Sequence, residues 1–113
     1  MEILDKVTLL VKTDFSPTPG PRRISEGDFS GELFREICLE PKLKEAIEKN
    51  KILFIDLDGT SGFGTSFLEE GFCGLIRINK YRYEDIIAHI ELKSDEEEYI
   101  KEDIMAYLMD AKN

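Results

Sequence analysis

The chain has 113 residues, a length typical of one folded domain, and its 24 acidic and 15 basic side chains give a formal net charge of -9. A surface of this sign repels phosphate backbones and anionic lipid head groups, so we expect neither a nucleic acid nor a membrane as a partner. Apolar residues make up 42% of the sequence, which is ordinary for a globular protein. We therefore expect one domain over residues 1–113.

The two cysteines, Cys38 and Cys73, each lie within an apolar segment, a position typical of small buried side chains. His89 is the only histidine, so the chain lacks the ligands that a zinc site needs, and we expect no metal or other cofactor. The N-terminus lacks the pattern of a signal peptide, and no segment approaches the ~20 apolar residues that span a bilayer. These features indicate a cytoplasmic protein.

Two strands and a loop are predicted before the first helix. Residues 3–12 are rich in aliphatic and β-branched side chains and predict a strand. Three prolines and a glycine within residues 17–21 exclude a regular helix there, so we predict a loop. A short edge strand at residues 23–25 follows.

The first helix is predicted to begin after Ser30, whose hydroxyl can cap it. Pro41 interrupts the pattern and is expected to start a second helical segment, which ends near Asn50. The side chains expected to face the core at helical spacing are Leu33, Phe34, Ile37, Cys38, Leu43, Ala46 and Ile47.

The second half of the chain predicts two strands that alternate with helices. Residues 51–57 include a continuous apolar run, typical of a strand covered on both faces. Residues 86–92 predict a further strand, although a helical turn could begin it at Tyr83. A helix between them and an amphipathic helix over residues 95–112 complete the alternation, which predicts an α/β fold with a mostly parallel or mixed four-stranded sheet covered by helices. The expected inward side chains are Phe67, Leu68, Phe72, Leu75 and Ile76, and then Ile100, Ile104, Tyr107, Leu108 and Ala111.

The stretch 58–66 is the candidate site, because sites on such sheets lie at the carboxyl ends of strands. It combines three glycines with several hydroxyl side chains where a strand gives way to a helix. In a structural interpretation, Ser66 and Glu69 form a capping box. In a functional one, the free N–H groups bind an anion, or an exposed hydroxyl accepts a phosphoryl group, with Ser66 preferred over Thr65. Glu69 and Glu70 would repel that phosphate.

A family resemblance rests on residues 52–77, ILFIDLDGTSGFGTSFLEEGFCGLIR. They resemble the strand–loop–helix of STAS domains of the anti-sigma-factor antagonist type, and resemble the STAS-like domain of unknown function still more closely. In STAS antagonists an Asp-Ser-Ser-Gly-Leu motif opens this helix, and a partner kinase phosphorylates its second serine. That serine corresponds to Ser66 and the first to Thr65, whereas Gly64 replaces the aspartate and Phe67 the glycine.

The resemblance implies a STAS-like fold and a regulatory role through protein–protein contact rather than an enzymatic one. The contact surface would comprise Gly62, Phe63 and Gly64 of the loop, with Glu69 and Glu70 of the helix. The implied partner is a histidine-kinase-like ATPase or an anti-sigma-type kinase, which would phosphorylate this protein or be restrained by it.

A competing motif begins with Phe54 and reads FIDLDGT, which resembles the first motif of haloacid-dehalogenase-type phosphatases. In that family Asp56 would be the nucleophile and Asp58 the general acid/base, with Mg²⁺ between carboxylates and phosphate. Only 53 residues follow Thr60, fewer than that fold usually needs, and residues 93–96 are a loose counterpart of its lysine and acidic pair. A small anion-binding domain is the third alternative.

Arg22 and Arg23 form a guanidinium pair directly after the proline-rich loop. Such a pair can bind a phosphate or the carboxylate of a partner, so both residues are anion-binding candidates. The alternative is a solvated pair with no ligand.

Overall fold

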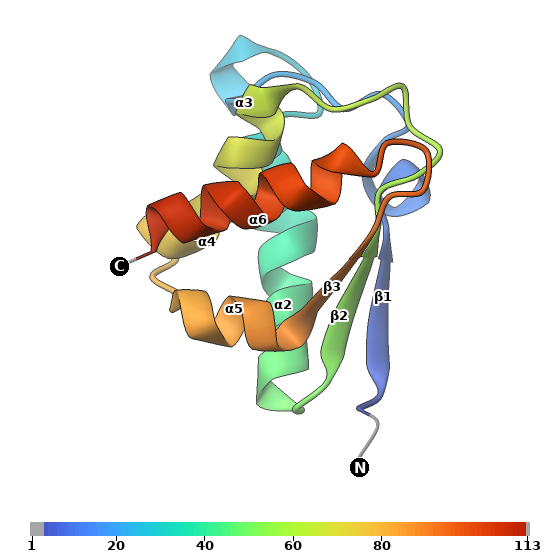
Figure 1. The fold of residues 1–113 in the computed structure, drawn as a ribbon. Coiled ribbons are helices and arrows are strands. Elements are labelled where there is room, and N and C mark those ends of the chain that lie inside the picture. The colour runs from blue at the N-terminus through green and yellow to red at the C-terminus, as the bar shows by residue number, and fades with distance from the viewer. Residues whose placement is uncertain (1–3, 113) are drawn as a thin grey trace.

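The computed structural model describes residues 4–112, whose strands form one three-stranded sheet in the order β1-β2-β3. Strands β1 (Lys6–Leu10), β2 (Ile52–Asp56) and β3 (Ile90–Lys93) run parallel, with Val7 paired to Leu53 and Leu53 to Ile90. Figure 1 shows β2 between the other two strands. The α/β class is confirmed, but the sheet has three strands where four were expected.

The edge strand predicted at residues 23–25 is instead a 3-10 helix, η2 (Ile24–Glu26). Its polar groups are satisfied locally, because the Glu26 carboxylate accepts from the Arg23 N–H at 2.8 Å and the Glu26 N–H donates to the Arg23 carbonyl at 2.9 Å. A backbone paired within its own turn has no need of a neighbouring strand. The prediction of a strand here was therefore wrong.

The strand predicted at residues 86–92 is shorter and begins later than expected. A helix, α5 (Tyr83–His89), occupies its first half and β3 begins only at Ile90. Ile86 is fully buried on this helix. A short apolar run does not by itself distinguish a buried strand from a buried helical turn, which explains the difference.

The strand predicted at residues 3–12 corresponds to β1, at the other edge of the sheet. A π-helical turn, η1 (Val11–Phe15), follows β1, and Ile3, the first residue of the predicted strand, lies outside the described residues.

The first long helix runs without a break through α1 (Gly31–Phe34), η3 (Arg35–Leu39) and α2 (Glu40–Glu48). Ser30 caps it as predicted, its hydroxyl accepting from the Leu33 N–H at 3.0 Å, whereas Pro41 lies inside the continuous helix and starts no new one. The π-helical turn η3 adds a residue and rotates the helix face. As a result Ile37, expected to face inward, is 58% exposed, and Arg35 is 3% exposed.

The second long helix has the same construction: α3 (Thr65–Leu68), η4 (Glu69–Cys73) and α4 (Gly74–Arg77). Its five predicted inward side chains are all buried. The helix packs closely on the first, since a Cβ on Gly31 would come within 2.4 Å of the Phe67 carbonyl oxygen. Cys38 and Cys73 are buried, as expected, and both are free thiols; burial raises the pKa of the Cys73 thiol to about 11.

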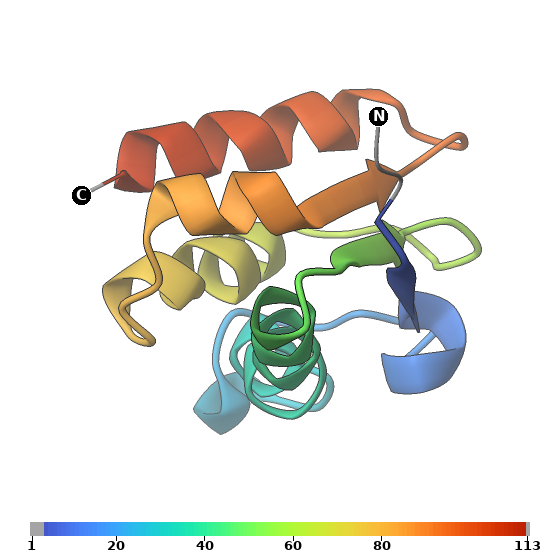
Figure 2. The same cartoon turned by 90° about the horizontal axis from the view of Figure 1, so that it is seen from below.

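The last helix, α6 (Tyr99–Ala111), starts later than predicted but keeps the predicted inward face. Ile100, Ile104 and Leu108 are buried, and Tyr107 and Ala111 pack against the core from its edge. Figure 2 shows α6 lying alongside α5. No helix within residues 4–112 is both long enough and apolar enough to cross a membrane.

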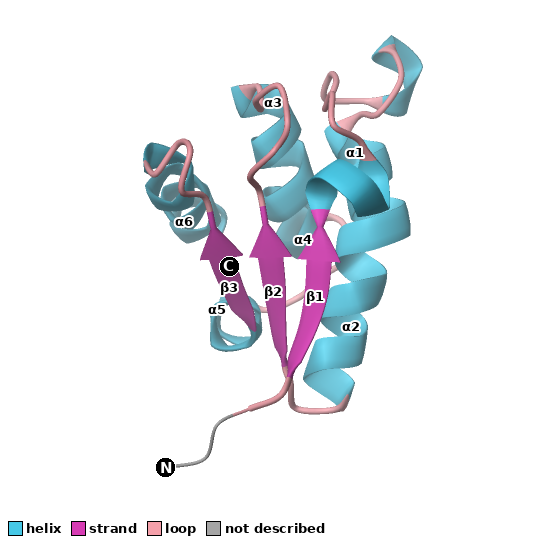
Figure 3. Ribbon diagram, turned by 90° about the vertical axis from the view of Figure 1, so that its right-hand side faces the viewer, coloured by secondary structure: helices cyan, strands magenta, loops and turns pink. Residues whose placement is uncertain are grey.

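All the long helices lie on one face of the sheet (Figures 1 and 3). The topology explains this, because the strand order 1-2-3 with right-handed crossovers places both connections on the same side. Leu9, Leu53 and Ile55 point toward the helices and are fully buried. The opposite side, which we call the open face, carries Thr8, Leu10, Ile52 and Phe54 between Lys6 and Glu91. The prediction that β2 is covered on both faces was therefore wrong.

Candidate functional site

The hydroxyl residues Thr65 and Ser66 lie at the start of α3, at the end of the loop that leaves the central strand. Both residues are exposed. Gly64 is the N-cap residue, with an extended backbone (φ -78°, ψ 153°) and no side chain to cap the helix. A Cβ on Gly64 would meet no atom within 4 Å, so the surface around this helix start is open.

The predicted capping box between Ser66 and Glu69 is not formed. Ser66 is the second residue of α3 rather than its cap, and the Glu69 carboxylate is bound by two guanidinium groups, from Arg22 at 2.6 Å and from Arg77 at 2.8 Å. A cap must precede the first helical residue for its oxygen to reach the free N–H groups, and Gly64 holds that place. Within residues 4–112 no hydrogen bond engages the Thr65 or Ser66 hydroxyl.

Glu70 is buried and forms the inner half of the same ion-pair network. The Arg35 guanidinium, 3% exposed, donates to the Glu70 carboxylate at 2.8 Å and to its backbone carbonyl at 2.7 Å. Arg22 lies 3.5 Å from Glu70 as well, so it touches both carboxylates. The network therefore contains three guanidinium groups and two carboxylates, an excess of one positive charge.

The pKa values in the network reflect this pairing. Burial raises the pKa of Glu69, but hydrogen bonds from Arg22 and Arg77 outweigh it, so the pKa of Glu69 lies below its ordinary value. The hydrogen bond to Glu69 in turn raises the pKa of Arg22. Both groups stay charged at neutral pH, and the carboxylates expected to repel a phosphate at Ser66 are neutralised by their own chain.

Arg22 and Arg23, the predicted anion-binding pair, have different surroundings. Arg22 is the residue that joins Glu69 and Glu70, so the carboxylates that it binds belong to its own chain. Arg23 is exposed and, in the part of the chain that the structure describes, makes no ion pair. Binding of an external anion by either residue stays a prediction.

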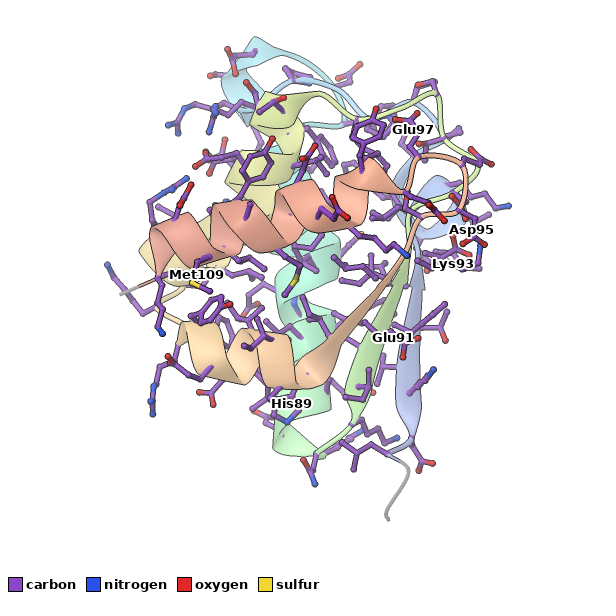
Figure 4. The ribbon with its side chains drawn as sticks, viewed as in Figure 1. His89, Glu91, Lys93, Asp95, Glu97 and Met109 are labelled. Atoms are coloured by element: carbon purple, nitrogen blue, oxygen red, sulfur yellow. The ribbon has the colours of Figure 1, made fainter. Side chains whose placement is uncertain are left out.

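The loop between β2 and α3 is fixed by Asp58, which links it to the segment after β3. The Asp58 carboxylate accepts from the Lys93 ammonium at 2.6 Å, from the Asp95 N–H at 3.1 Å and from the Glu96 N–H at 3.0 Å. The hydrogen bond from Lys93 is the largest cause that lowers the pKa of Asp58 to about 2, and the same bond raises the pKa of Lys93. Figure 4 shows Lys93 and Asp95 together at this end of β3.

The remaining loop residues hold the backbone in a turn that presents α3. Gly59 and Gly62 have φ angles of +84° and +120°, a region that favours glycine. The Ser61 N–H donates to the Pro17 carbonyl at 2.8 Å, which ties the loop to the proline-rich segment. Phe63 packs against Phe67 with ring centroids 5.5 Å apart. Gly62 and Phe63 are half-buried, whereas Gly64, the residue before α3, is exposed. The contacts of Ser61 and Phe63 therefore anchor the loop close to the start of α3.

The two aspartates of the phosphatase-like motif have structural partners. Asp56 accepts from the Asp58 N–H at 3.0 Å and lies 3.9 Å from the Lys93 ammonium, while Asp58 already accepts from three donors. A hollow of about 10 Å³ beside this loop, lined among others by Asp58, Phe63 and Glu97, has room for about one water molecule. Among residues 4–112 no three His, Cys, Asp or Glu side chains are grouped to hold a metal ion.

Sequence reasoning missed two residues of the site, Arg35 and Arg77, and considered Lys93 only as a loose counterpart of the phosphatase lysine. Arg35 lies within an apolar stretch next to Phe34, and a buried arginine of this kind needs a carboxylate partner, so the pattern held a signal. A Cβ on Gly74 would lie 2.0 Å from the Arg35 guanidinium, so this glycine makes room for the arginine. Gly74 thus allows close approach to the first helix. Arg77 carried no sequence signal, and nothing in the sequence pairs Lys93 with Asp58.

Comparison with known proteins places these features in one family. A family model described as a STAS-like domain of unknown function matches residues 30–99, which is more than half of the chain. The matched segment contains Arg35, the loop after β2 and the whole second long helix. No curated protein and no solved structure gave a significant match.

Proposed function

This chain belongs to the family of STAS-like domains of unknown function, and we propose that it is a regulatory module that binds a protein partner through the start of α3. The observation that carries the proposal is the pair Thr65 and Ser66: two exposed hydroxyls, engaged by no described group, at the start of a helix that is mostly buried from Phe67 to Ile76. A rigid helix start with free hydroxyls offers a partner a fixed and chemically modifiable target.

Ser66 is the proposed phosphoacceptor. A kinase would transfer the γ-phosphoryl group of ATP to the Ser66 oxygen, releasing ADP and the hydroxyl proton. The phosphate adds about -1.5 to -2 charge at neutral pH, which is enough to disrupt a docked surface. Glu69 and Glu70, which follow one turn later, do not oppose this, because Arg22, Arg35 and Arg77 neutralise them.

Exposed apolar side chains in the segment before α1 complete the proposed surface. Phe29 is 42% exposed and Ile24 is 47% exposed, and both belong to the segment that precedes α1. The Phe29 ring packs edge-to-face against the Phe15 ring, with the two ring centroids 5.8 Å apart. Exposed aromatic and aliphatic groups of this kind anchor protein–protein contacts.

The partner proposed from the family resemblance is a histidine-kinase-like ATPase or an anti-sigma-type kinase. The acidic chain, with its net charge of -9, favours a partner with a basic binding surface. The hollow beside the loop, about 10 Å³, has room for about one water molecule, which favours a surface that binds a protein over a small-molecule pocket.

The proposal is tested by intact mass measurement of the protein purified from its native host, combined with affinity capture of its partner. We expect a species 80 Da heavier in the wild type, where 80 Da is roughly the mass of the added phosphoryl group, and its loss in Ser66→Ala. Ser66→Asp is expected to weaken partner binding, whereas Thr13→Asp, the same charge change at an exposed residue after β1, is the matched control. Partner binding that is equal in Ser66→Asp and wild type contradicts the proposal.

A further inference from the structure

The open face of the sheet is unusual for parallel strands. Parallel sheets occur almost always with both faces covered, because their crossover connections and apolar composition favour burial on both sides. Here Leu10, Ile52 and Phe54 are partly exposed on the side away from the helices, and none of them packs against the core. Figure 3 looks directly onto this side of the strands.

Polar residues flank Phe54 on the open face. The register places Phe54 between Thr8 of β1 and Glu91 of β3. The Lys6 ammonium lies 5.1 Å from the centre of the Phe54 ring and forms an ion pair with Glu91 at 2.9 Å. Lys6 and Glu91 thus reach over the ring from opposite edge strands. Figure 4 labels Glu91 in the row of alternate residues that runs along β3.

We propose that the open face binds a second copy of this chain, with the two sheets packed face to face around Phe54. Sheets that pack in this way lie about 10 Å apart with strands nearly aligned. A two-fold axis along β2 sets Phe54 against its own copy and lays β1 of each chain over β3 of the other. Lys6 of one chain then lies beside the Glu91 of the second chain, and the two ion pairs within the chains are exchanged for two between them.

The charges of Lys6 and Glu91 favour this axis over the alternative. A two-fold axis across the strands would lay β3 over β3 and bring Glu91 opposite its own copy, which is unfavourable. The exchange along β2 costs little, because Lys6 and Glu91 are about half exposed (46% and 47%) and such pairs are weak. Dimer formation removes the Lys6–Glu91 ion pair from above the Phe54 ring and buries the ring against an apolar surface.

The loop end of the open face opposes close contact and sets where the two sheets meet. Asp56, Asp58 and Asp95 surround a single cation, Lys93, so this end carries an excess of negative charge in each copy. We expect the closest approach at Ile52 and Phe54. The net charge of -9 per chain also opposes association, and at 0.15 M salt it is screened beyond about 8 Å.

The test is a measurement of mass in solution by sedimentation at 0.15 M salt over concentrations up to about 1 mM, with charge-exchanged variants. The wild type is expected to show a monomer–dimer equilibrium that Phe54→Asp abolishes. Lys6→Glu and Glu91→Lys are each expected to weaken the dimer at least about tenfold, because each places like charges opposite one another. An equimolar mixture of the two variants is expected to form a heterodimer, since both contacts between the chains are then of opposite charge.

Two controls separate loss of the interface from loss of the fold. The double variant Lys6→Glu/Glu91→Lys restores the pair and should dimerise as the wild type does. Lys49→Glu makes the same charge change in an exposed pair at the C-terminal end of α2, a helix on the other side of the sheet from the open face, and should leave the dimer unchanged. A wild type that stays monomeric at every concentration overturns the proposal. So does a dimer that Phe54→Asp leaves intact, or a mixture that does not associate.

Discussion

Two ion-pair clusters join segments of this protein that are distant in the sequence, and the two clusters differ in burial. Arg35 and Glu70 meet between the two long helices, with side chains 3% and 7% exposed. Lys93 and Asp58 meet between two loops at the ends of β2 and β3, and the lysine is 37% exposed. The first cluster joins packed helices deep in the molecule, whereas the second fixes the course of a surface loop. Loss of one partner is therefore expected to cost more stability in the first cluster, where water is excluded, than in the second.

The largest expected effect is that of Arg35→Ala. Removal of one partner leaves the Glu70 carboxylate buried without its main cation, a change that costs about 3–5 kcal/mol in other buried pairs. We expect a loss of that size in the free energy of unfolding, measured by urea denaturation with circular dichroism.

Arg77→Ala is the matched control for this prediction. It removes a guanidinium from the exposed side of the same network, where the Arg77 side chain is 46% exposed. We expect it to cost less than about 1 kcal/mol. Equal losses in Arg35→Ala and Arg77→Ala would show that burial does not set the strength of this network.

The second prediction concerns the pH dependence produced by the loop cluster. The pKa of Asp58 falls from its ordinary value of 3.8 to about 2 in the folded chain, chiefly through the hydrogen bond from Lys93. A lowered pKa means that the stabilisation by Asp58 is fully present above pH 3.8 and is lost as the pH falls toward and through 2.

Asp58→Asn should therefore reduce the slope of stability against pH in that window and lower stability at pH 7. Thermal unfolding monitored between about pH 2 and pH 7 measures both effects. If the variant and the wild type give parallel curves, the Lys93–Asp58 pair does not couple protonation to folding.

The smallest expected effect is that of Gly64→Asp. The site has room for a Cβ and an ordinary negative φ, so aspartate can adopt the backbone conformation and its carboxylate can accept from the free N–H groups of α3. We expect a gain of a few tenths of a kcal/mol. A loss of stability in the same denaturation assay would contradict the open surroundings of Gly64. The variant also restores the aspartate of the STAS antagonist motif.

The sequence by itself determined the features that depend on local pattern. The apolar run of β2 and the inward faces of α6 and of the second long helix follow from periodicity, because each residue's environment there is set by its neighbours in the chain. The exposed position of Thr65 and Ser66 also follows locally, from a strand, a glycine-rich loop and a helix in succession.

Only the tertiary structure decided the features that depend on contacts between distant segments. The π-helical turn that buries Arg35 and exposes Ile37 forms where that arginine meets Glu70, thirty-five residues away. The bond between Lys93 and Asp58 spans the same separation. The open face of the sheet results from strand order and crossover handedness, which no single segment encodes. Local periodicity reports which side of an element is apolar, but only the assembled fold determines what covers it.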